Sequence, residues 1–404
     1  MNLPEIEGRA VLPTDSGWDD ARRNWNLAVD QRPAAVVEAA GPADVAALLR
    51  AGLRVAPQST GHGSELLGPL DDVVLLKTSR LKELSLDEGV LRAGAGVLAR
   101  EAADAAAEHG VAPVLGLAAG VGVTGFVLGG GTGWLSRTHG LAANHVRAFD
   151  VVLASGETRR VDAESEPDLF WALRGGGGRG AVVTAVELAA HPVEPHAGVL
   201  TWPAERAAEL LQRFHEWTQD APEAVMAVFR YLAIPTGPIA MIVAARIDGQ
   251  PFEPMRDSLR PIGPAELVRV AGDPEDPMPT GGDGFLLREL DVEAVAAVLD
   301  DLAPAGLLEI RLLGGALSRA PEGCGVAGSI AAPYSVFYGG PASPGLPAKL
   351  TEIRERLSPY WAGDQPTASR RGSDPASLFG EHWERLRGVQ RAYDPEGQIV
   401  TTNA

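Results

Sequence analysis

Hydrophobic and polar positions follow a mixed strand and helix pattern in the first half of the chain. Residues 35–57 predict a strand, a turn at Gly41-Pro42, an amphipathic helix that begins near Pro42, and a second strand from Leu53. Residues 149–161 predict a hairpin that turns at Ser155-Gly156. Short strands that alternate with helices are typical of an α/β region, which we expect to end near Val193.

The pattern changes from His196 onwards. A predicted helix over residues 203–219 precedes two strand-like stretches at 224–235 and 239–249, and later apolar stretches also read as strands. Strand pairs beside helices favour an antiparallel sheet that is covered on one face. A Pro- and Gly-rich mobile loop is predicted at 251–284 and a helix at 291–303. A last helix is predicted at 377–394, where it ends before a proline.

Composition limits the classes of partner and compartment. The chain of 404 residues has a formal net charge of −18, which argues against nucleic acid or an anionic membrane as the main partner. Any bound phosphate must then be held by local backbone. The single cysteine, Cys324, excludes an internal disulfide and a cysteine-rich metal site. The first residues show no export signal, so we expect a cytoplasmic protein.

One stretch of the chain, from Gly116 to Trp134, has nineteen residues, no charge and eight glycines. The length suits a membrane helix, but clustered glycines disfavour a helix by about 1 kcal/mol each. The spacing of Gly120, Gly122 and Gly125 matches GxGxxG, a weak signal here, and no Gly-Lys-Ser/Thr follows to make a phosphate loop. Bare backbone of this kind approaches a large planar or anionic ligand closely, or it forms a turn that serves packing alone.

Four separated stretches carry a resemblance to a known family. They are RVAPQSTGHGS at 54–64, the glycine-rich stretch continued through LSRTHGLAANHV to residue 146, DLFWALRGGGGRGAVVTAVEL at 168–188, and the C-terminal stretch at 379–395. Together, in this order, they resemble the FAD-linked oxidases of the berberine bridge enzyme type, within the vanillyl-alcohol oxidase superfamily. The glycine-rich stretch is then interpreted as a cradle for flavin.

The resemblance implies an α+β fold with a two-part, PCMH-type FAD-binding domain at 1–193 and 374–404. A substrate domain with a helix-covered antiparallel sheet is expected at 194–373. His62 stands where the family joins a histidine to the flavin 8α-methyl, and Ala118 stands where many relatives have a second linking cysteine, so a single covalent bond to FAD is expected. The residues implied to bind the cofactor are Ser59, Thr60, Gly61, His62, Gly63, Ala118, Val121, Gly122, Gly125, Gly131 and Val182.

The resemblance also implies a reaction. It predicts an oxidase that moves a hydride from an alcohol, sugar or amine group of a small molecule, in secondary metabolism, to flavin N5, with reoxidation by oxygen. Val121 falls where relatives gate oxygen. A non-redox cyclase or lyase on the same scaffold is the alternative, because the tyrosine-bearing strand expected before the last helix is replaced by QPTASRRGSDPA at 365–376.

The catalytic base is the open question in the sequence. Strand alternation puts Tyr334 and Tyr338 on one face, so either is a candidate catalytic residue, with packed aromatics as the competing interpretation. Glu309 and Arg311 share a face of the preceding strand and are interpreted as an ion pair. The family's Asn-Phe-Gly after the four glycines is Arg179-Gly180-Ala181 here. His139 and His145 flank the glycine-rich stretch. Either could contact flavin or substrate, and the competing interpretation places both outside the site.

Overall fold

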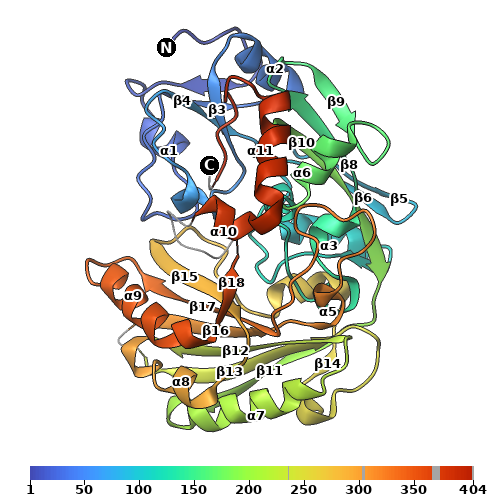
Figure 1. Cartoon of the computed structure of the whole chain (residues 1–404), viewed down its shortest axis with the longest axis vertical. Coiled ribbons are helices and arrows are strands. Elements are labelled where there is room, and N and C mark those ends of the chain that lie inside the picture. Colours follow the sequence, from blue (N-terminus) through green and yellow to red (C-terminus); the bar gives the residue numbers. More distant parts are fainter. Residues whose placement is uncertain (235, 303–304, 366–373, 403–404) are drawn as a thin grey trace.

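The computed structural model describes residues 1–234, 236–302, 305–365 and 374–402. Figure 1 shows two parts in contact: one contains two smaller sheets and both ends of the chain, and the other contains one large sheet. The chain forms the first part, crosses once into the second, and returns to the first at its C-terminal end (Figure 1). The predicted α+β class is confirmed.

The first small sheet contains the predicted strand–helix–strand unit. Its strands, in spatial order, are β1 (Arg9–Val11), β2 (Ala35–Glu38), β4 (Val73–Lys77) and β3 (Arg54–Gln58). Strands β2, β4 and β3 are parallel, and helix α2 (Pro42–Arg50) joins β2 to β3. The apolar side of α2 packs on this sheet through Val45, Leu48 and Leu49. Because β3 ends at Gln58, the loop that follows starts at the edge where parallel strands present their carboxyl ends.

The second small sheet is antiparallel. Its strands, in spatial order, are β5 (Leu84–Asp87), β6 (Val90–Gly94), β10 (Ala181–Pro192), β8 (Val146–Leu153) and β9 (Thr158–Val161), and β7 (Val111–Pro113) pairs with the far end of β10. The predicted hairpin is confirmed as the pair β8 and β9. Helices of this region are α1 (Trp18–Ala21), α3 (Ala99–Ala107), α4 (Val123–Leu128), α5 (Ser136–His139) and α6 (Pro167–Leu173).

The large sheet has eight antiparallel strands. Their spatial order is β14 (Arg260–Pro261), β11 (His196–Pro203), β13 (Ile239–Arg246), β12 (Val225–Ala233), β16 (Gly306–Leu312), β17 (Tyr334–Pro341), β15 (Thr280–Leu287) and β18 (Trp361–Asp364). Helices α7 (Ala207–Gln219), α8 (Val292–Ala296) and α9 (Leu346–Leu357) pack against one face. Figure 1 shows these helices on the outer side, so the other face of the sheet is directed toward the first part. A sheet covered on one face by helices was predicted and is confirmed.

Two predictions for the second part differ from the structure. Residues 251–284, predicted to form a mobile loop, contain β14, a 3-10 helix at Pro264–Arg269 and the start of β15. The glycines of β15 hid this strand, yet they have a packing reason: a Cβ on Gly282 would lie 2.5 Å from the ring of Phe337 on β17. The helix predicted at 291–303 is limited to α8 and a 3-10 turn at Asp300–Leu302.

The C-terminal residues return to the first part. Helices α10 (Pro375–Phe379) and α11 (Trp383–Tyr393) lead there, α11 ends before Pro395 as predicted, and α11 contacts α6. Ile399 then forms a bridge with Val55 of β3. Most of the segment at 365–376, on which the missing tyrosine strand was argued, lies outside the described residues, and the domain boundaries at 193 and 374 stay a prediction.

Candidate functional site

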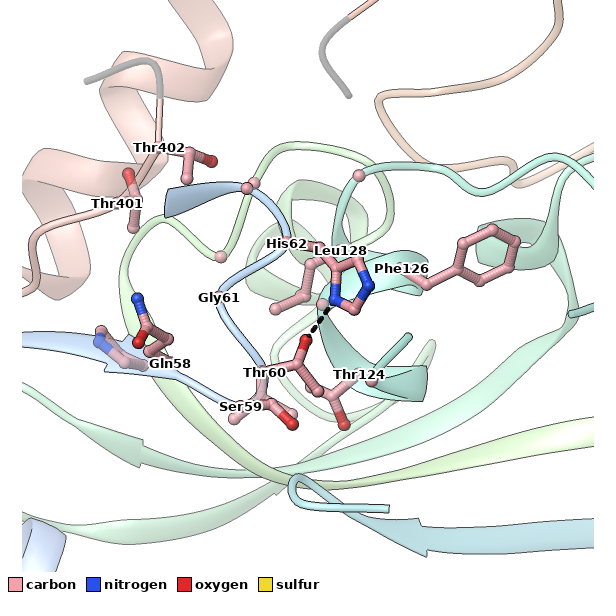
Figure 2. Close-up of a pocket in the computed structure, with 18 of the residues that line it drawn as sticks. Gln58, Ser59, Thr60, Gly61, His62, Thr124, Phe126, Leu128, Thr401 and Thr402 are labelled. Carbon is pink, nitrogen blue, oxygen red and sulfur yellow. Dashed lines mark hydrogen bonds between the residues drawn. The ribbon is translucent and has the colours of Figure 1, made fainter. Parts of the chain in front are cut away.

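A cavity of about 370 Å³ lies in the first part, where three loops and the C-terminal residues meet. Its walls come from the loop after β3, from α4 and the loop before it, from the turn that leads into β10, and from residues 400–402 (Figure 2). A cavity of this size is in the range of cofactor and small-molecule sites. None of its lining residues is an aspartate, glutamate, lysine or arginine.

Glycines let the walls of the cavity approach one another. Gly61 has φ +84°, and a Cβ there would lie 2.5 Å from Cβ of Asn24, so only glycine fits this turn. A Cβ on Gly122 would lie 2.7 Å from Oγ of Ser59. The loop after β3 and the glycine-rich stretch therefore pack directly on each other and form one site.

Other positions leave room and polar groups for a ligand. Gly125 is exposed to the cavity, and a Cβ built there would meet no atom within 4 Å. Three lining hydroxyls, those of Ser59, Thr124 and Thr401, are buried and have no hydrogen-bond partner in the described part of the chain. Buried hydroxyls normally have partners, so these atoms suit a ligand rich in oxygen and nitrogen. The main chain at Gly177 and Gly178, with φ near +80°, adds backbone of the kind that binds anions.

His62 is the titratable side chain of the cavity wall. Its Nδ1 lies 2.7 Å from Oγ1 of Thr60, drawn as the dashed line in Figure 2, and its ring stacks on Trp25 with centroids 4.3 Å apart. Burial lowers the pKa of His62 to about 4. The imidazole is therefore neutral at pH 7, and a neutral imidazole nitrogen is a nucleophile.

One buried cation lies just behind the cavity wall. Nζ of Lys77, at the end of β4, donates to the side-chain oxygen of Gln58, which lines the cavity, and to the carbonyl oxygen of Arg23. Burial lowers the pKa of Lys77 to about 8, although the Glu38 carboxylate acts in the opposite direction. Lys77 thus gives this wall a positive potential without lining it, which favours an anionic ligand.

Most of the residues predicted to bind the cofactor meet at this cavity. Those that line it are Ser59, Thr60, Gly61, His62, Gly63, Val121, Gly122 and Gly125. Gly131 lies one layer behind, because a Cβ there would be 2.6 Å from the ring of Phe126, which lines the cavity. Ala118 and Val182 are not among the lining residues. Val182 packs toward α2, and its neighbours Ala181 and Val183 face the cavity instead, as strand alternation requires.

Sequence reasoning missed several residues of the wall. They are Gln58, Thr124, Phe126, Leu128, Gly177, Gly178, Phe379, Thr401 and Thr402, among others. Gly177 and Gly178 belong to the quoted four-glycine motif and were open to the same argument as the other glycines. Thr401 and Thr402 reach the cavity through the bridge between Ile399 and Val55, and no local pattern signals that return.

The structure does not bring the two candidate catalytic tyrosines to this cavity. Tyr334 and Tyr338 share a face of β17 as predicted, but this is the face covered by α7 and α9. The hydroxyl of Tyr334 lies 2.8 Å from Oγ1 of Thr218, and that of Tyr338 lies 3.2 Å from a carboxylate oxygen of Asp283. Burial raises the pKa of both phenols, so they are protonated at neutral pH. Both phenols thus pack away from the cavity in this structure, and their catalytic role stays a prediction.

The opposite face of the large sheet contains a buried group of charges. Glu309 on β16 accepts hydrogen bonds from Arg230 on β12 and from its own face neighbour Arg311, and Arg230 also pairs with Asp273. Burial disfavours the charged carboxylate, but the two guanidiniums outweigh that effect and hold the pKa of Glu309 well below its usual range. The predicted pairing of Glu309 with Arg311 is present, with Arg230 as a second partner.

The two histidines that flank the glycine-rich stretch form a separate cluster. His145 is hydrogen-bonded through Nδ1 to Nε2 of His191, at 3.0 Å, and His139 stacks on His191 with centroids 3.9 Å apart. None of the three lines the cavity. In the described residues no group of side chains could hold a metal ion, and no helix is long and apolar enough to cross a membrane.

Comparisons with known proteins find an FAD binding domain and flavoprotein relatives. Residues 33–162 match the family described as FAD binding domain. The chain is 32% identical over 205 residues to (R)-6-hydroxynicotine oxidase of Paenarthrobacter nicotinovorans, covering 49% of this chain and 45% of that protein. It is 24% identical to an uncharacterised FAD-linked oxidoreductase of Bacillus subtilis, covering 98% of this chain and 96% of that protein. In contrast to that match over nearly the full length, the chain spans less than half the length of several other curated relatives that it matches.

Solved structures extend the likeness to the whole fold. A BBE-like protein of Physcomitrella patens superposes with a TM-score of 0.86 at 18% identity, covering 98% of this chain and 96% of that chain. The berberine bridge enzyme of Eschscholzia californica gives 0.83 at 18% identity, covering 98% and 96%. The fold and the site together define an FAD-binding protein. The chain has the berberine bridge enzyme fold and an FAD binding domain, which confirms the resemblance seen in its sequence.

Proposed function

We propose that this protein is an FAD-dependent oxidase that holds its flavin through His62. The observation that carries the proposal is the cavity itself, which the matched FAD binding domain and later segments of the chain line together. Unhindered glycine, a neutral imidazole and three hydroxyls without a partner among the described residues meet there. FAD held by these residues would supply the redox chemistry, as the acceptor of a hydride at N5 that oxygen reoxidises. The chain's own part is to bind the cofactor, orient the substrate and exclude water.

The residues of the cavity take distinct parts in this function. Backbone N–H groups around Gly61 and Gly177, with the hydroxyls of Ser59 and Thr124, would hold the anionic and polar groups of FAD. Lys77 strengthens that binding from behind the wall through Gln58. Val121 lines the cavity at the place where the resemblance puts oxygen access.

The substrate is proposed at the level of a chemical class. We propose an alcohol, sugar or amine group of a small molecule, since the matched relatives include a 6-hydroxynicotine oxidase and a glucooligosaccharide oxidase. The face of the large sheet opposite α7 and α9 is the surface that the second part directs toward the cofactor domain. A role in secondary metabolism and a cytoplasmic location belong to the same proposal.

The first experiment asks whether flavin is present and how it is held. Purified full-length protein is expected to be yellow and to keep its colour in the pellet after acid precipitation. His62→Ala should release the colour into the supernatant, whereas His109→Ala, at an exposed position outside the cavity, should not. Colourless wild-type protein that takes up no added FAD would refute the proposed function.

A second experiment separates an oxidase from a non-redox cyclase or lyase. Candidate alcohols, sugars and amines are added to the yellow protein without oxygen, and the flavin absorbance is followed. Bleaching that oxygen reverses, with formation of hydrogen peroxide, is the expected result. Product formation without bleaching would show the non-redox reaction instead.

A further inference from the structure

The inner face of the large sheet, opposite α7 and α9, carries polar and aromatic side chains that are not part of the cofactor cavity. Glu309 and Arg311 lie on β16, and Phe337 on β17 is the register partner of Glu309. Arg230 on β12 is the partner of Glu309 on its other side. Cross-strand partners share a face of a sheet, so these four side chains form one surface group.

The loop before β15, residues 271–279, connects this group with the cofactor domain. At one end it is bonded to Arg230, which donates to a backbone carbonyl and pairs with Asp273. Further along, Cα of Glu275 lies 3.5 Å from the position of a Cβ on Gly120. The loop therefore runs from the charged side chains to the glycine-rich stretch.

The loop between β16 and β17, residues 313–333, makes a second connection. Cβ of Ala327 lies 3.1 Å from the position of a Cβ on Gly130. Between Gly120 and Gly130 the glycine-rich stretch lines the cofactor cavity. The inner face of the sheet is directed toward this part of the molecule (Figure 1). The group on the sheet thus borders the space in which a substrate would meet the flavin.

Arg311 differs from Arg230 in how its guanidinium is used. Arg230 is bonded to both Glu309 and Asp273, and its side chain is 5% exposed. Arg311 donates to Glu309 through Nε, and neither of its terminal nitrogens has a partner among the described residues. Its side chain is 28% exposed. Glu309 therefore holds the guanidinium of Arg311 in place, and the two terminal nitrogens are open to a ligand.

Phe337 supplies an apolar surface beside this guanidinium. Its half-buried ring lies along β15, because a Cβ on Gly282 would be 2.5 Å from Cζ and one on Gly284 would be 3.3 Å from Cδ2. The partner of Arg311 on β17 is Ser335, so Arg311 and Phe337 are diagonal neighbours. Such neighbours are typically about 7–8 Å apart, and one small molecule can contact both side chains.

The charges of the group favour a ligand with a single negative charge. Its two guanidiniums are balanced by the carboxylates of Glu309 and Asp273, so the group has no net charge. One carboxylate of a ligand can accept from both terminal nitrogens of Arg311 as a bidentate pair. A dianionic phosphate would meet greater repulsion from the two protein carboxylates.

We propose that Arg311 and Phe337 form a substrate subsite, and that the substrate is an alcohol or amine that also bears a carboxylate. Arg311 binds the carboxylate, Phe337 packs against the apolar body of the molecule, and Glu309 is a positioning residue for Arg311. This inference rests on the proposed function, because it narrows the substrate class of the oxidase.

The test uses probes that differ in charge but hardly in shape. Full-length holoenzyme is titrated by calorimetry with benzoate and with benzamide. Benzoate should bind at least roughly tenfold more tightly than benzamide, the effect of one hydrogen-bonded pair between charged groups. Phenyl phosphate should bind more weakly than benzoate, and tighter binding would overturn the assignment of a carboxylate.

Variants locate the binding of the probes. Arg311→Gln should abolish the preference for benzoate and leave benzamide affinity within about twofold of wild type. Arg311→Lys retains the charge but not the planar fork, so benzoate should bind several-fold more weakly than in wild type. Phe337→Leu should weaken the binding of both probes by a similar factor. Arg256→Gln, which breaks an exposed pair with Glu253, is the control and should change neither affinity.

The outcomes distinguish this inference from the function on which it rests. Flavin content and thermal unfolding check that each variant is folded. Equal affinity for the two probes in yellow wild-type protein, or a preference that persists in folded Arg311→Gln, would overturn the subsite and leave an FAD oxidase. If Arg311→Gln does not fold, unchanged benzoate affinity in Arg311→Lys would overturn the subsite as well. Failure of the wild type to bind FAD would overturn both.

Discussion

Buried polar groups lack partners in the cavity wall but are paired on the inner face of the large sheet, the face opposite α7 and α9. Among the residues that the structure describes, the cavity wall has no charged lining residue, and the hydroxyls of Ser59, Thr124 and Thr401 have no hydrogen-bond partner. On the sheet, Glu309 and Arg230 are almost fully buried, yet the charges neutralise one another. A site that binds a ligand has polar atoms that lack hydrogen-bond partners within the protein. In a structural network, the buried polar and charged groups are one another's partners. That difference distinguishes the cofactor site from the charged cluster.

The largest expected effect concerns the buried ion pairs of Glu309 with Arg230 and Arg311 on the large sheet. Glu309→Gln leaves the guanidiniums of Arg230 and Arg311 without their shared buried carboxylate and should lower the free energy of unfolding by about 3–5 kcal/mol. The measurement is urea unfolding of the apoprotein. Asp168→Asn breaks the exposed pair with Arg385 and, as the control, should change stability by less than about 1 kcal/mol. Equal effects of the two variants would show that the cluster is not structural.

Gly61→Ala tests whether bare backbone is obligatory where the cavity loops meet. The methyl group would collide with Asn24 at a positive φ, so we expect a loss of about 3 kcal/mol in stability together with weakened FAD binding. Gly110→Ala is a matched control, because Gly110 also has a positive φ, +69°, but no neighbour within 4 Å. If both variants lose the same stability, strain alone and not close packing explains Gly61.

The histidine cluster predicts acid sensitivity in the first part of the molecule. Burial, with the neighbouring His139, His145 and Arg147, lowers the pKa of His191 to about 3. An unfolded histidine takes up its proton near pH 6.5, so the unfolded state binds more protons below that pH and stability falls as pH decreases from about 6.5 toward 3.

Removal of this titration should flatten the pH dependence. Between pH 7.5 and 5, His191→Phe should lose about 2 kcal/mol less stability than wild type, as measured by urea unfolding at each pH. His109→Phe, at an exposed position, should behave like wild type. A wild-type slope that persists in His191→Phe would assign the acid sensitivity to other groups.

The smallest effect concerns the tyrosines that the sequence offered as a catalytic base. Tyr334→Phe removes hydrogen bonds to Thr218 and Gln219 and should cost about 1 kcal/mol in stability. The rate of anaerobic flavin reduction by substrate should stay within twofold of wild type, because the phenol lies on the face away from the cavity. A large loss of reduction rate in a folded variant would restore the catalytic interpretation.

The parts that the sequence predicted well are those with a local cause. The strand–helix–strand unit around α2, the hairpin of β8 and β9 and the end of α11 all follow from periodicity and from turn or breaker residues. Eight of the eleven residues that the resemblance implied for the cofactor line the cavity, because the stretches that carry the resemblance form the loops of its wall. Gly131 does not line the cavity but lies directly behind Phe126, which does, and its lack of a side chain leaves room for that ring.

The parts that could not be predicted depend on which surfaces meet. Alternation correctly placed Tyr334 and Tyr338 on one face, but it cannot say which face helices will cover. Thr401 and Thr402 reach the cavity only because Ile399 pairs with β3, more than 340 residues earlier in the chain. Strand β15 was obscured by its glycines, one of which, Gly282, lies against the ring of Phe337 on the adjacent strand.

The central claim is that the cavity is shaped for FAD, and Gly125 tests it most directly. Gly125→Ala places a methyl group in open cavity space within helix α4, so apoprotein should be as stable as wild type or up to about 1 kcal/mol more stable. Titration calorimetry of the two apoproteins with FAD should then show at least roughly tenfold weaker binding by the variant. Equal affinity for FAD in wild type and Gly125→Ala would contradict the claim.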